Sequence, residues 1–182
     1  MLTRHSQPLR RKKLNFRPDF IAEDITDIDF AHLKSMGITT CFIDLDGTVV
    51  TPGTYAVRAA FGDALAGSSM RIIIATNRPQ SRSLNQLESD LSASGVIHPK
   101  GLWAKPSKRY MQNALKQFDL QPEQVVMVGD RTIQDVFGAN RVGISSLLVR
   151  RHGNIRGLRE RLMSLLQSML FSRYERYYCN LD

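Results

Sequence analysis

The sequence predicts an α/β protein of the Rossmann-like kind, in which helices flank a parallel sheet. Two observations lead to this prediction. Short apolar runs rich in β-branched residues alternate with segments of helical period, which is typical of parallel sheets wrapped by helices. Polar residues directly follow several of these runs, at the edge of the sheet where such folds bind ligands.

Five strands are expected, each in a short apolar run. They are "ITTCFIDL" (38–45), "RIIIAT" (71–76), the run 95–104, "QVVMVG" (124–129) and "ISSLLV" (144–149). Helices are expected between them, at about 55–66, 79–92, 107–118 and 132–141. Pro79 and Pro106 fall near the starts of two of these helices, where a missing N–H is harmless. Residues 22–36 are expected to form a short helix or turn before the first strand.

Charge divides the chain of 182 residues into three parts. Residues 1–18 hold six Arg or Lys and no acid, and residues 150–182 hold seven Arg and three acids. Residues 19–149 hold twelve basic and fourteen acidic residues, so the formal charge of +8 belongs to the ends. We expect a basic arm at 1–18, one folded domain at 19–150 and a basic C-terminal segment at 151–182. Basic ends attract membrane headgroups or nucleic acid, or simply keep the surface soluble.

Cysteine use favours an intracellular protein. Cys41 and Cys179 are too few for a disulfide framework or a cysteine-based zinc site. The start lacks the apolar core of a secretory signal, and no run of about 18 apolar residues is present to span a bilayer. We expect a protein that is cytoplasmic or peripheral on the inner face of a membrane, on the matrix side in a mitochondrion. The acid-free start is compatible with a targeting segment or a basic arm.

Polar residues at four strand ends point to chemistry. They are Asp44 and Asp46 after the first strand, Thr76 and Asn77 after the second, Lys105 before the third helix, and Asp130 and Asp135 after the fourth strand. Several carboxylates without sulfur or a well-placed histidine make an oxygen-only site, which suits Mg²⁺. A hydroxyl and an ammonium that face such a site would bind the oxygens of a phosphate.

Each of these residues also has a simpler structural interpretation. An Asp-Gly pair after an apolar run is often just a turn, and Thr76 with Asn77 would cap the following helix. Lys105 would be a surface lysine, Lys108 competes with it for the same role, and Asp135 would be an exposed helical acid. The four histidines are scattered and are interpreted as non-catalytic.

In their order along the chain, the motifs resemble those of the haloacid dehalogenase-like (HAD) phosphohydrolases. The four matching segments are "DLDGT", the Thr of "IIIATN", the Lys of "AKPSK" and "GDRTIQD". The resemblance implies that Asp44 is a nucleophile that accepts the phosphoryl group and that Asp46 is its acid/base partner. It also implies that Thr76 and Lys105 hold the phosphate, with Asn77 beside them.

The same resemblance implies a Mg²⁺ site. Asp44, the backbone carbonyl of Asp46 and Asp130 would hold the ion, and Asp135 would lie behind them or reach the ion through water. The cation would remove the repulsion between the carboxylate and the phosphate.

The spacing of the motifs leaves no room for a cap domain. About 28 residues separate Thr48 from Thr76, and about 29 separate Thr76 from Lys105, enough for one helix and its strands in each case. An open site of this kind must exclude water with a large substrate, a partner or a surface. Phosphate on a macromolecule or a lipid is therefore favoured over a free sugar phosphate.

An amphipathic helix is expected near the C-terminus. Its apolar stripe consists of Leu158, Leu162, Leu165, Leu166, Met169 and Leu170, and Phe171 departs from this stripe. The stripe would dock on the protein's own sheet or on a second subunit, or lie in a membrane interface among tyrosines and arginines.

Residues 14–149 resemble the YqeG-like branch, which includes mitochondrial-type phosphatidylglycerophosphate phosphatases. That branch commonly has Asn where this chain has Gly47. The resemblance implies a phosphorylated substrate, namely the anionic headgroup of phosphatidylglycerophosphate at a membrane surface. A phosphatase for nucleic-acid ends or phosphoproteins and a non-catalytic phosphate-binding module remain alternatives, and the oligomeric state is left open.

Overall fold

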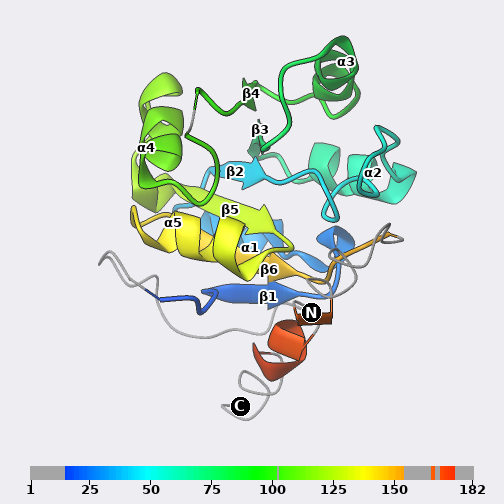
Figure 1. Ribbon diagram of the computed structural model, residues 1–182. Coiled ribbons are helices and arrows are strands. Elements are labelled where there is room, and N and C mark those ends of the chain that lie inside the picture. The colour runs from blue at the N-terminus through cyan, green and yellow to red at the C-terminus, as the bar shows by residue number, and fades with distance from the viewer. Residues whose placement is uncertain (1–14, 102, 154–164, 167–168, 175–182) are drawn as a thin grey trace.

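The computed structural model describes residues 15–101, 103–153, 165–166 and 169–174. At its centre is a parallel sheet in the order β1-β6-β5-β2-β3-β4, seen in Figure 1. The strands are β1 (Phe20–Ala22), β2 (Thr40–Ile43), β3 (Arg71–Ala75), β4 (Val96–Ile97), β5 (Val125–Gly129) and β6 (Ser145–Val149). The predicted Rossmann-like α/β class is therefore confirmed.

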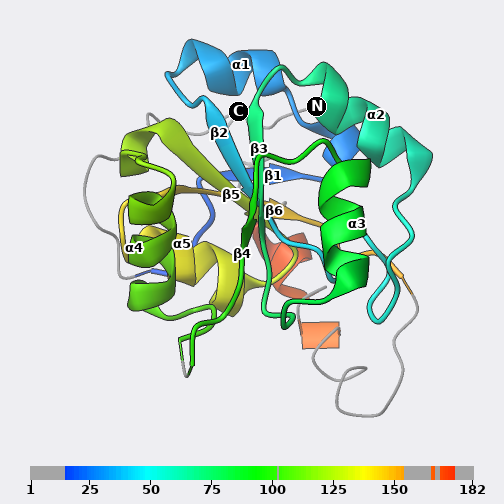
Figure 2. The ribbon, with the colours of Figure 1, turned by 90° about the horizontal axis from the view of Figure 1, so that it is seen from above.

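Helices cover both faces of the sheet (Figure 2). One face carries α1 (Phe30–Ser35), α2 (Ala59–Gly67) and α3 (Arg82–Asp90), and the other carries α4 (Lys108–Gln117) and α5 (Gly138–Asn140). The segments η1 (Ile25–Asp27) and η2 (Pro122–Gln124) are short 3₁₀-helices. The segment η3 (Thr132–Phe137) is a π-helix that leads into α5.

The alternation of β2 explains both cores. Cys41 and Ile43 pack with α1, α2 and α3, whereas Phe42 packs with α4 on the opposite face. Successive strand residues point to opposite faces of a sheet, so a strand with helices on both sides is apolar throughout. All four residues of β2 are buried.

Two strands differ from the expected ones. The edge strand β1 was not expected, and it ends where the predicted helix or turn at 22–36 begins. It pairs with β6 through Phe20 and Leu147. The run 95–104 contributes a strand of only two residues, β4, which pairs with the end of β3. Both are short edge strands, whose pattern is too brief to show a period.

No cap domain interrupts the described part of the chain. A single helix, α2, lies between β2 and β3, and a single helix, α3, lies between β3 and β4. None of the helices in the described ranges is long and apolar enough to cross a bilayer.

Both ends of the described chain meet beside β1. Phe171 is buried against Ile21, Val136 and Leu148, and the Tyr174 hydroxyl donates a hydrogen bond to the carbonyl of Phe16 (2.9 Å). Phe171, which departs from the predicted apolar stripe, therefore anchors the C-terminal helix together with Tyr174.

Most of the described stripe is exposed, whereas Leu170 is half-buried. Leu165, Leu166 and Met169 are 64%, 46% and 70% exposed, while Leu158 and Leu162 lie outside the described residues. The C-terminal helix thus contacts the domain through its aromatic side and leaves apolar side chains facing outward.

Candidate active site

The topology places the site at the carboxyl end of the central strands. The chain passes from β2 to β3 on one side, and later to β5 on the other side of β2. Ile43 is in register with Ile74 and with Val128, so the residues that follow these strands meet at one edge. A change of direction of this kind creates a crevice at the carboxyl ends of the strands.

Three buried carboxylates meet in this crevice. One oxygen each of Asp44, Asp130 and Asp135 lies within 4.8 Å of the others, although Asp44 is far from the other two in sequence. The backbone N–H of Asp44 donates to the carbonyl of Val128 (2.9 Å), which fixes the end of β2 beside β5. The predicted acidic cluster is therefore formed by these three side chains.

Gly129 makes room for one of the three. A side chain at position 129 would overlap the carboxylate of Asp135, so the strand can pass close to that acid only as glycine. The Asp135 carboxylate also accepts the N–H of Arg131 (3.1 Å). The segment "GDRTIQD" thus folds back so that its two acids flank the end of β5.

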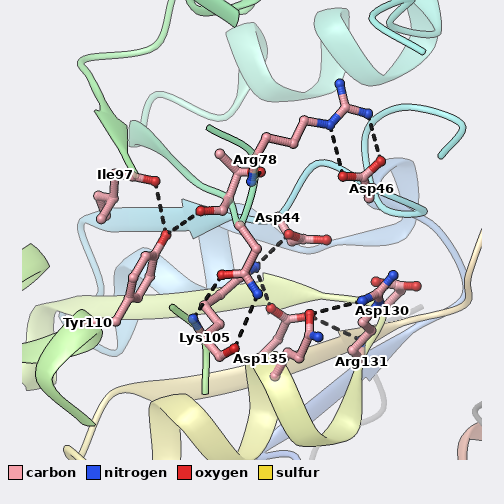
Figure 3. Close-up of polar contacts among 12 residues, drawn as sticks. Asp44, Asp46, Arg78, Ile97, Lys105, Tyr110, Asp130, Arg131 and Asp135 are labelled. Atoms are coloured by element: carbon pink, nitrogen blue, oxygen red, sulfur yellow. Dashed lines mark hydrogen bonds and ion pairs between the residues drawn. The ribbon is translucent and has the colours of Figure 1, made fainter. Parts of the chain in front are cut away.

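Lys105 supplies positive charge to the cluster, as Figure 3 shows. Its Nζ donates to Asp44 (2.5 Å) and to Asp135 (2.7 Å), and its side chain is fully buried. Lys108, the rival at sequence level, is exposed at the start of α4. Lys105 is therefore the lysine that lies in the site.

Asn77 and Tyr110 hold the frame around Lys105. The Asn77 side chain accepts from the backbone N–H of Lys105 (2.8 Å) and donates to its carbonyl (3.2 Å). The Tyr110 hydroxyl lies 3.0 Å from the carbonyls of both Thr76 and Ile97. Asn77 was predicted to bind substrate, and in this structure its amide is used to position the lysine.

Thr76 lies where the motif requires, one residue beyond β3. Its side-chain oxygen accepts the N–H of Arg78 (3.1 Å), and the residue is 1% exposed. A phosphate-binding role for Thr76 stays a prediction.

Burial and crowding raise the proton affinity of two of the acids. The pKa of Asp44 rises to about 6, because burial and the nearby Asp135 outweigh the opposing effect of Lys105. Burial, with Asp44 and Asp135 nearby, raises the pKa of Asp130 to about 7. Burial would lower the pKa of Lys105, but Asp135 and Asp44 raise it above its ordinary value. The lysine therefore remains charged.

The donor set fits a hard divalent cation. Asp130 has one buried carboxylate oxygen, Oδ1, without a hydrogen-bond partner, and buried polar atoms seldom stay unpaired. Three carboxylates so close together repel one another, and the two cations that contact them, Lys105 and Arg151, offset only part of that charge. An ion such as Mg²⁺, which prefers oxygen ligands, would satisfy both the orphaned atom and the excess negative charge.

Asp46 lies apart from this cluster. Its carboxylate points toward Arg78 (Figure 3), with contacts of 2.6 and 2.9 Å to the guanidinium. Burial would raise the pKa of Asp46, but the hydrogen bonds and charge of Arg78 outweigh it and lower the pKa below its ordinary value. The predicted contact of a metal with the Asp46 carbonyl stays a prediction.

Two arginines of the site had no role predicted from the sequence, although Arg78 was expected among the polar residues at a strand end. Arg78 follows Thr76 and Asn77 directly, and Arg151 donates to Asp130 (2.6 Å) from two residues beyond β6. The rule that polar residues after a strand end line the site would have found Arg151 if it had been applied to the fifth predicted strand.

Gly47 makes the approach of Arg151 feasible. Gly47 has φ +88°, and a Cβ there would lie 2.7 Å from Asp130 Oδ2 and 3.0 Å from Cγ of Arg151. The position where the related branch commonly has Asn is thus tightly enclosed by the two members of this ion pair.

Similar proteins agree with this arrangement. Residues 102–161 match the family described as HAD-hydrolase-like. The chain is 24% identical over 137 residues to the probable phosphatase YqeG of Bacillus subtilis, covering 74% of this chain and 77% of that protein. It is 42% identical over 43 residues to a glyceraldehyde 3-phosphate phosphatase of Pyrococcus furiosus, a match that covers 24% of this chain and spans only 18% of that enzyme.

A solved structure has the same fold. The haloacid dehalogenase-like family protein SP0104 of Streptococcus pneumoniae superimposes with a TM-score of 0.51 at 17% identity, over 72% of this chain and 91% of that one. The order of the four motifs, the match of residues 102–161 to the HAD-hydrolase-like family and the similarity to the probable phosphatase YqeG all agree with the resemblance to HAD phosphohydrolases of the YqeG-like branch.

Proposed function

We propose that the chain is a Mg²⁺-dependent phosphomonoester phosphatase that works through an aspartyl-phosphate. The observation that supports this most strongly is the meeting of Asp44, Asp130 and Asp135 around the ammonium of Lys105. Carboxylates that outnumber the cations in a buried site are suited to bind a divalent ion and a phosphate together.

The residues divide the reaction between them. Asp44 attacks the phosphorus, the bond from phosphorus to the leaving oxygen breaks, and Asp46, which must enter this step protonated, gives that oxygen its proton. Water then attacks the phosphorus of the aspartyl-phosphate, Asp46 takes a proton from this water, and Asp44 is regenerated as phosphate leaves. Splitting one displacement into two steps lowers each barrier, and Asp46 alternates between acid and base.

The buried lysine stabilises charge during both steps. Lys105 lies against the nucleophile, where its ammonium can offset the charge that builds on the phosphoryl oxygens. Asp44, Asp130 and Asp135 would hold Mg²⁺, which when bound screens the nucleophile from the phosphate. Asp135 also holds Lys105 in place.

This proposal is tested with an aryl phosphate. Wild-type protein should release phosphate from 4-nitrophenyl phosphate with Mg²⁺ present and stop when EDTA is added. A phosphate-binding module without turnover would bind phosphate but would not hydrolyse the ester, and that outcome would overturn the proposal.

We further propose that the substrate is the phosphomonoester headgroup of phosphatidylglycerophosphate, met at an anionic membrane surface. The resemblance of residues 14–149 to the YqeG-like branch supports this assignment, as do the uncapped site and the exposed Leu165, Leu166 and Met169. Basic ends favour an anionic surface. The protein would then be cytoplasmic, or peripheral on the inner face of a membrane, on the matrix side in a mitochondrion.

A panel of substrates separates this proposal from its alternatives. Hydrolysis of the phospholipid in vesicles, without action on oligonucleotides that carry 3′- or 5′-phosphates or on phosphopeptides, is the expected result. Preference for either polymer would show that the basic ends serve a different polyanion and would remove the lipid assignment.

A further inference from the structure

Arg78 grips the carboxylate of Asp46 at two points. Its Nε donates to Oδ2 (2.9 Å) and its Nη2 donates to Oδ1 (2.6 Å), as Figure 3 shows. A paired contact of this kind fixes both the position and the plane of a carboxylate. A single contact would leave the carboxylate free to rotate about its last bond.

Arg78 is itself held in place. Its Nη1 donates to the carbonyl of Thr54 (2.7 Å), and its guanidinium carbon lies 4.6 Å from the centre of the Tyr55 ring. The arginine side chain is only 12% exposed. Asp46, on the loop after β2, is thus connected to the loop after β3 and to residues 54 and 55.

Without Arg78, little would orient Asp46. The other hydrogen bond that the described chain makes to this carboxylate comes from the N–H of Gly53, at 3.3 Å, and the Asp46 side chain is 28% exposed. Water would then compete for the oxygens, and the side chain would visit more than one rotamer.

We propose that Arg78 is a positioning residue that holds the Asp46 carboxylate in the orientation from which it serves the leaving group. The inference rests on the proposed phosphatase function and adds a role for a residue outside the four motif positions. Arg78 acts through Asp46, so its removal should harm those steps in which Asp46 moves a proton.

Substrates with different leaving groups reveal such a role. 4-Nitrophenolate departs without much help, whereas an alkoxide must receive a proton as it leaves. The ratio kcat/KM covers the steps up to the first irreversible one, here transfer of phosphorus to Asp44, so it reports on the acid role of Asp46. The measurement is kcat and KM on 4-nitrophenyl phosphate and on glycerol 2-phosphate.

The variants are Arg78→Met, Arg78→Lys and the matched control Arg82→Met. Arg82 is exposed at the start of α3. For Arg78→Met we expect kcat/KM on glycerol 2-phosphate to fall about 10- to 100-fold more than on the aryl phosphate, within the range of general acid catalysis. Arg78→Lys keeps the charge but loses the two-point contact, so its kcat/KM on glycerol 2-phosphate should lie between those of wild type and Arg78→Met. The control should change neither.

A double variant isolates the route. If Arg78 acts through Asp46, Arg78→Met should cost almost nothing further in an Asp46→Ala background. Equal losses on both substrates, or full additivity with Asp46→Ala, would overturn the inference and leave Arg78 as a tether of the loop. Inactivity of wild-type protein on both substrates would overturn the proposed function instead. Thermal unfolding of every variant shows whether a loss of activity is a loss of fold. If Arg78→Met does not fold, the comparison is made with Arg78→Lys, which retains the positive charge.

Discussion

Asp44 and Asp46 lie two residues apart, yet their surroundings differ in every respect that matters for chemistry. Asp44 is buried with Asp130, Asp135 and the ammonium of Lys105. Asp46 is partly exposed and is held by the guanidinium of Arg78. We call the first group the inner side of the site and the Asp46–Arg78 pair the outer side.

The difference explains how one short motif can supply two kinds of carboxylate. On the inner side, burial and neighbouring acids raise the pKa of Asp44, so the group needs cations nearby to act as an anion. On the outer side, burial is outweighed by Arg78, and the pKa of Asp46 falls. The inner side is therefore suited to hold a metal and a phosphoryl group, and the outer side keeps Asp46 oriented and ionised, the state in which it takes a proton from water.

The largest effect should come from the inner nucleophile. Asp44→Asn removes the attacking oxygen anion, and we expect phosphate release from 4-nitrophenyl phosphate to drop by about 10³-fold or more. Asp63→Asn, at an exposed position of α2, is the control and should keep wild-type rates. Activity of Asp44→Asn within tenfold of wild type would show that the nucleophile is assigned to the wrong residue.

Replacing the inner cation should cost both rate and stability. Lys105→Met leaves Asp44 and Asp135 without their shared ammonium, and breaking a buried ion pair typically costs about 3–5 kcal/mol. We expect the rate to fall about 100-fold and the unfolding temperature to fall. Added Mg²⁺ should raise the unfolding temperature of this variant more than that of wild type. Lys108→Met should match wild type in both assays. A Lys105→Met protein of unchanged stability and activity would contradict the inner arrangement.

Asp130 tests whether the inner acids bind a metal. Asp130→Asn removes the negative charge and replaces one carboxylate oxygen by an NH₂ group, so the affinity for a divalent ion should fall about 10- to 100-fold. Titration with Mn²⁺ followed by electron paramagnetic resonance measures this without any substrate. Unchanged Mn²⁺ affinity would show that the ion is held elsewhere.

Arg151 should give the smallest effect, and one of opposite sign. The Arg151 guanidinium forms an ion pair with the Asp130 carboxylate, so a metal ion that binds this carboxylate oxygen must displace the guanidinium. Arg151→Met should therefore raise Mn²⁺ affinity about three- to tenfold, the range expected for the net contribution of one hydrogen bond. A loss of affinity would show that Arg151 supports the metal site and does not compete with it.

The sequence predicted the class of fold and the main strands because both depend on long patterns. The apolar run of β2 and the acids that end it form a signal several residues long, and the order of the motifs adds information from distant segments. Strand β1 was missed because three residues carry no measurable period, and the run 95–104 was read as longer than the two residues of β4. Edge strands of this length are defined by the partner that they pair with.

Within the site, residue types were predictable but partners were not. Lys105 was expected near a phosphate, and its shared contact with Asp44 and Asp135 emerges only from the folded arrangement. Asn77 was expected at the substrate, which stays a prediction, and its bonds to the backbone of Lys105 emerge only from the folded arrangement. Arg78 follows that same strand end, but a guanidinium reaches far enough that sequence position does not say which acid it will meet.

The hydrogen bond between Tyr174 and Phe16 has a consequence for how the whole protein would meet a charged surface. The lysine- and arginine-rich residues before Phe16 and the arginines near Tyr174 are attached to the domain at one corner. A surface that captures one of these segments holds the other at high local concentration, so the two should bind with avidity. Binding of the whole protein to an anionic surface would then weaken more steeply with rising ionic strength than binding of either segment alone.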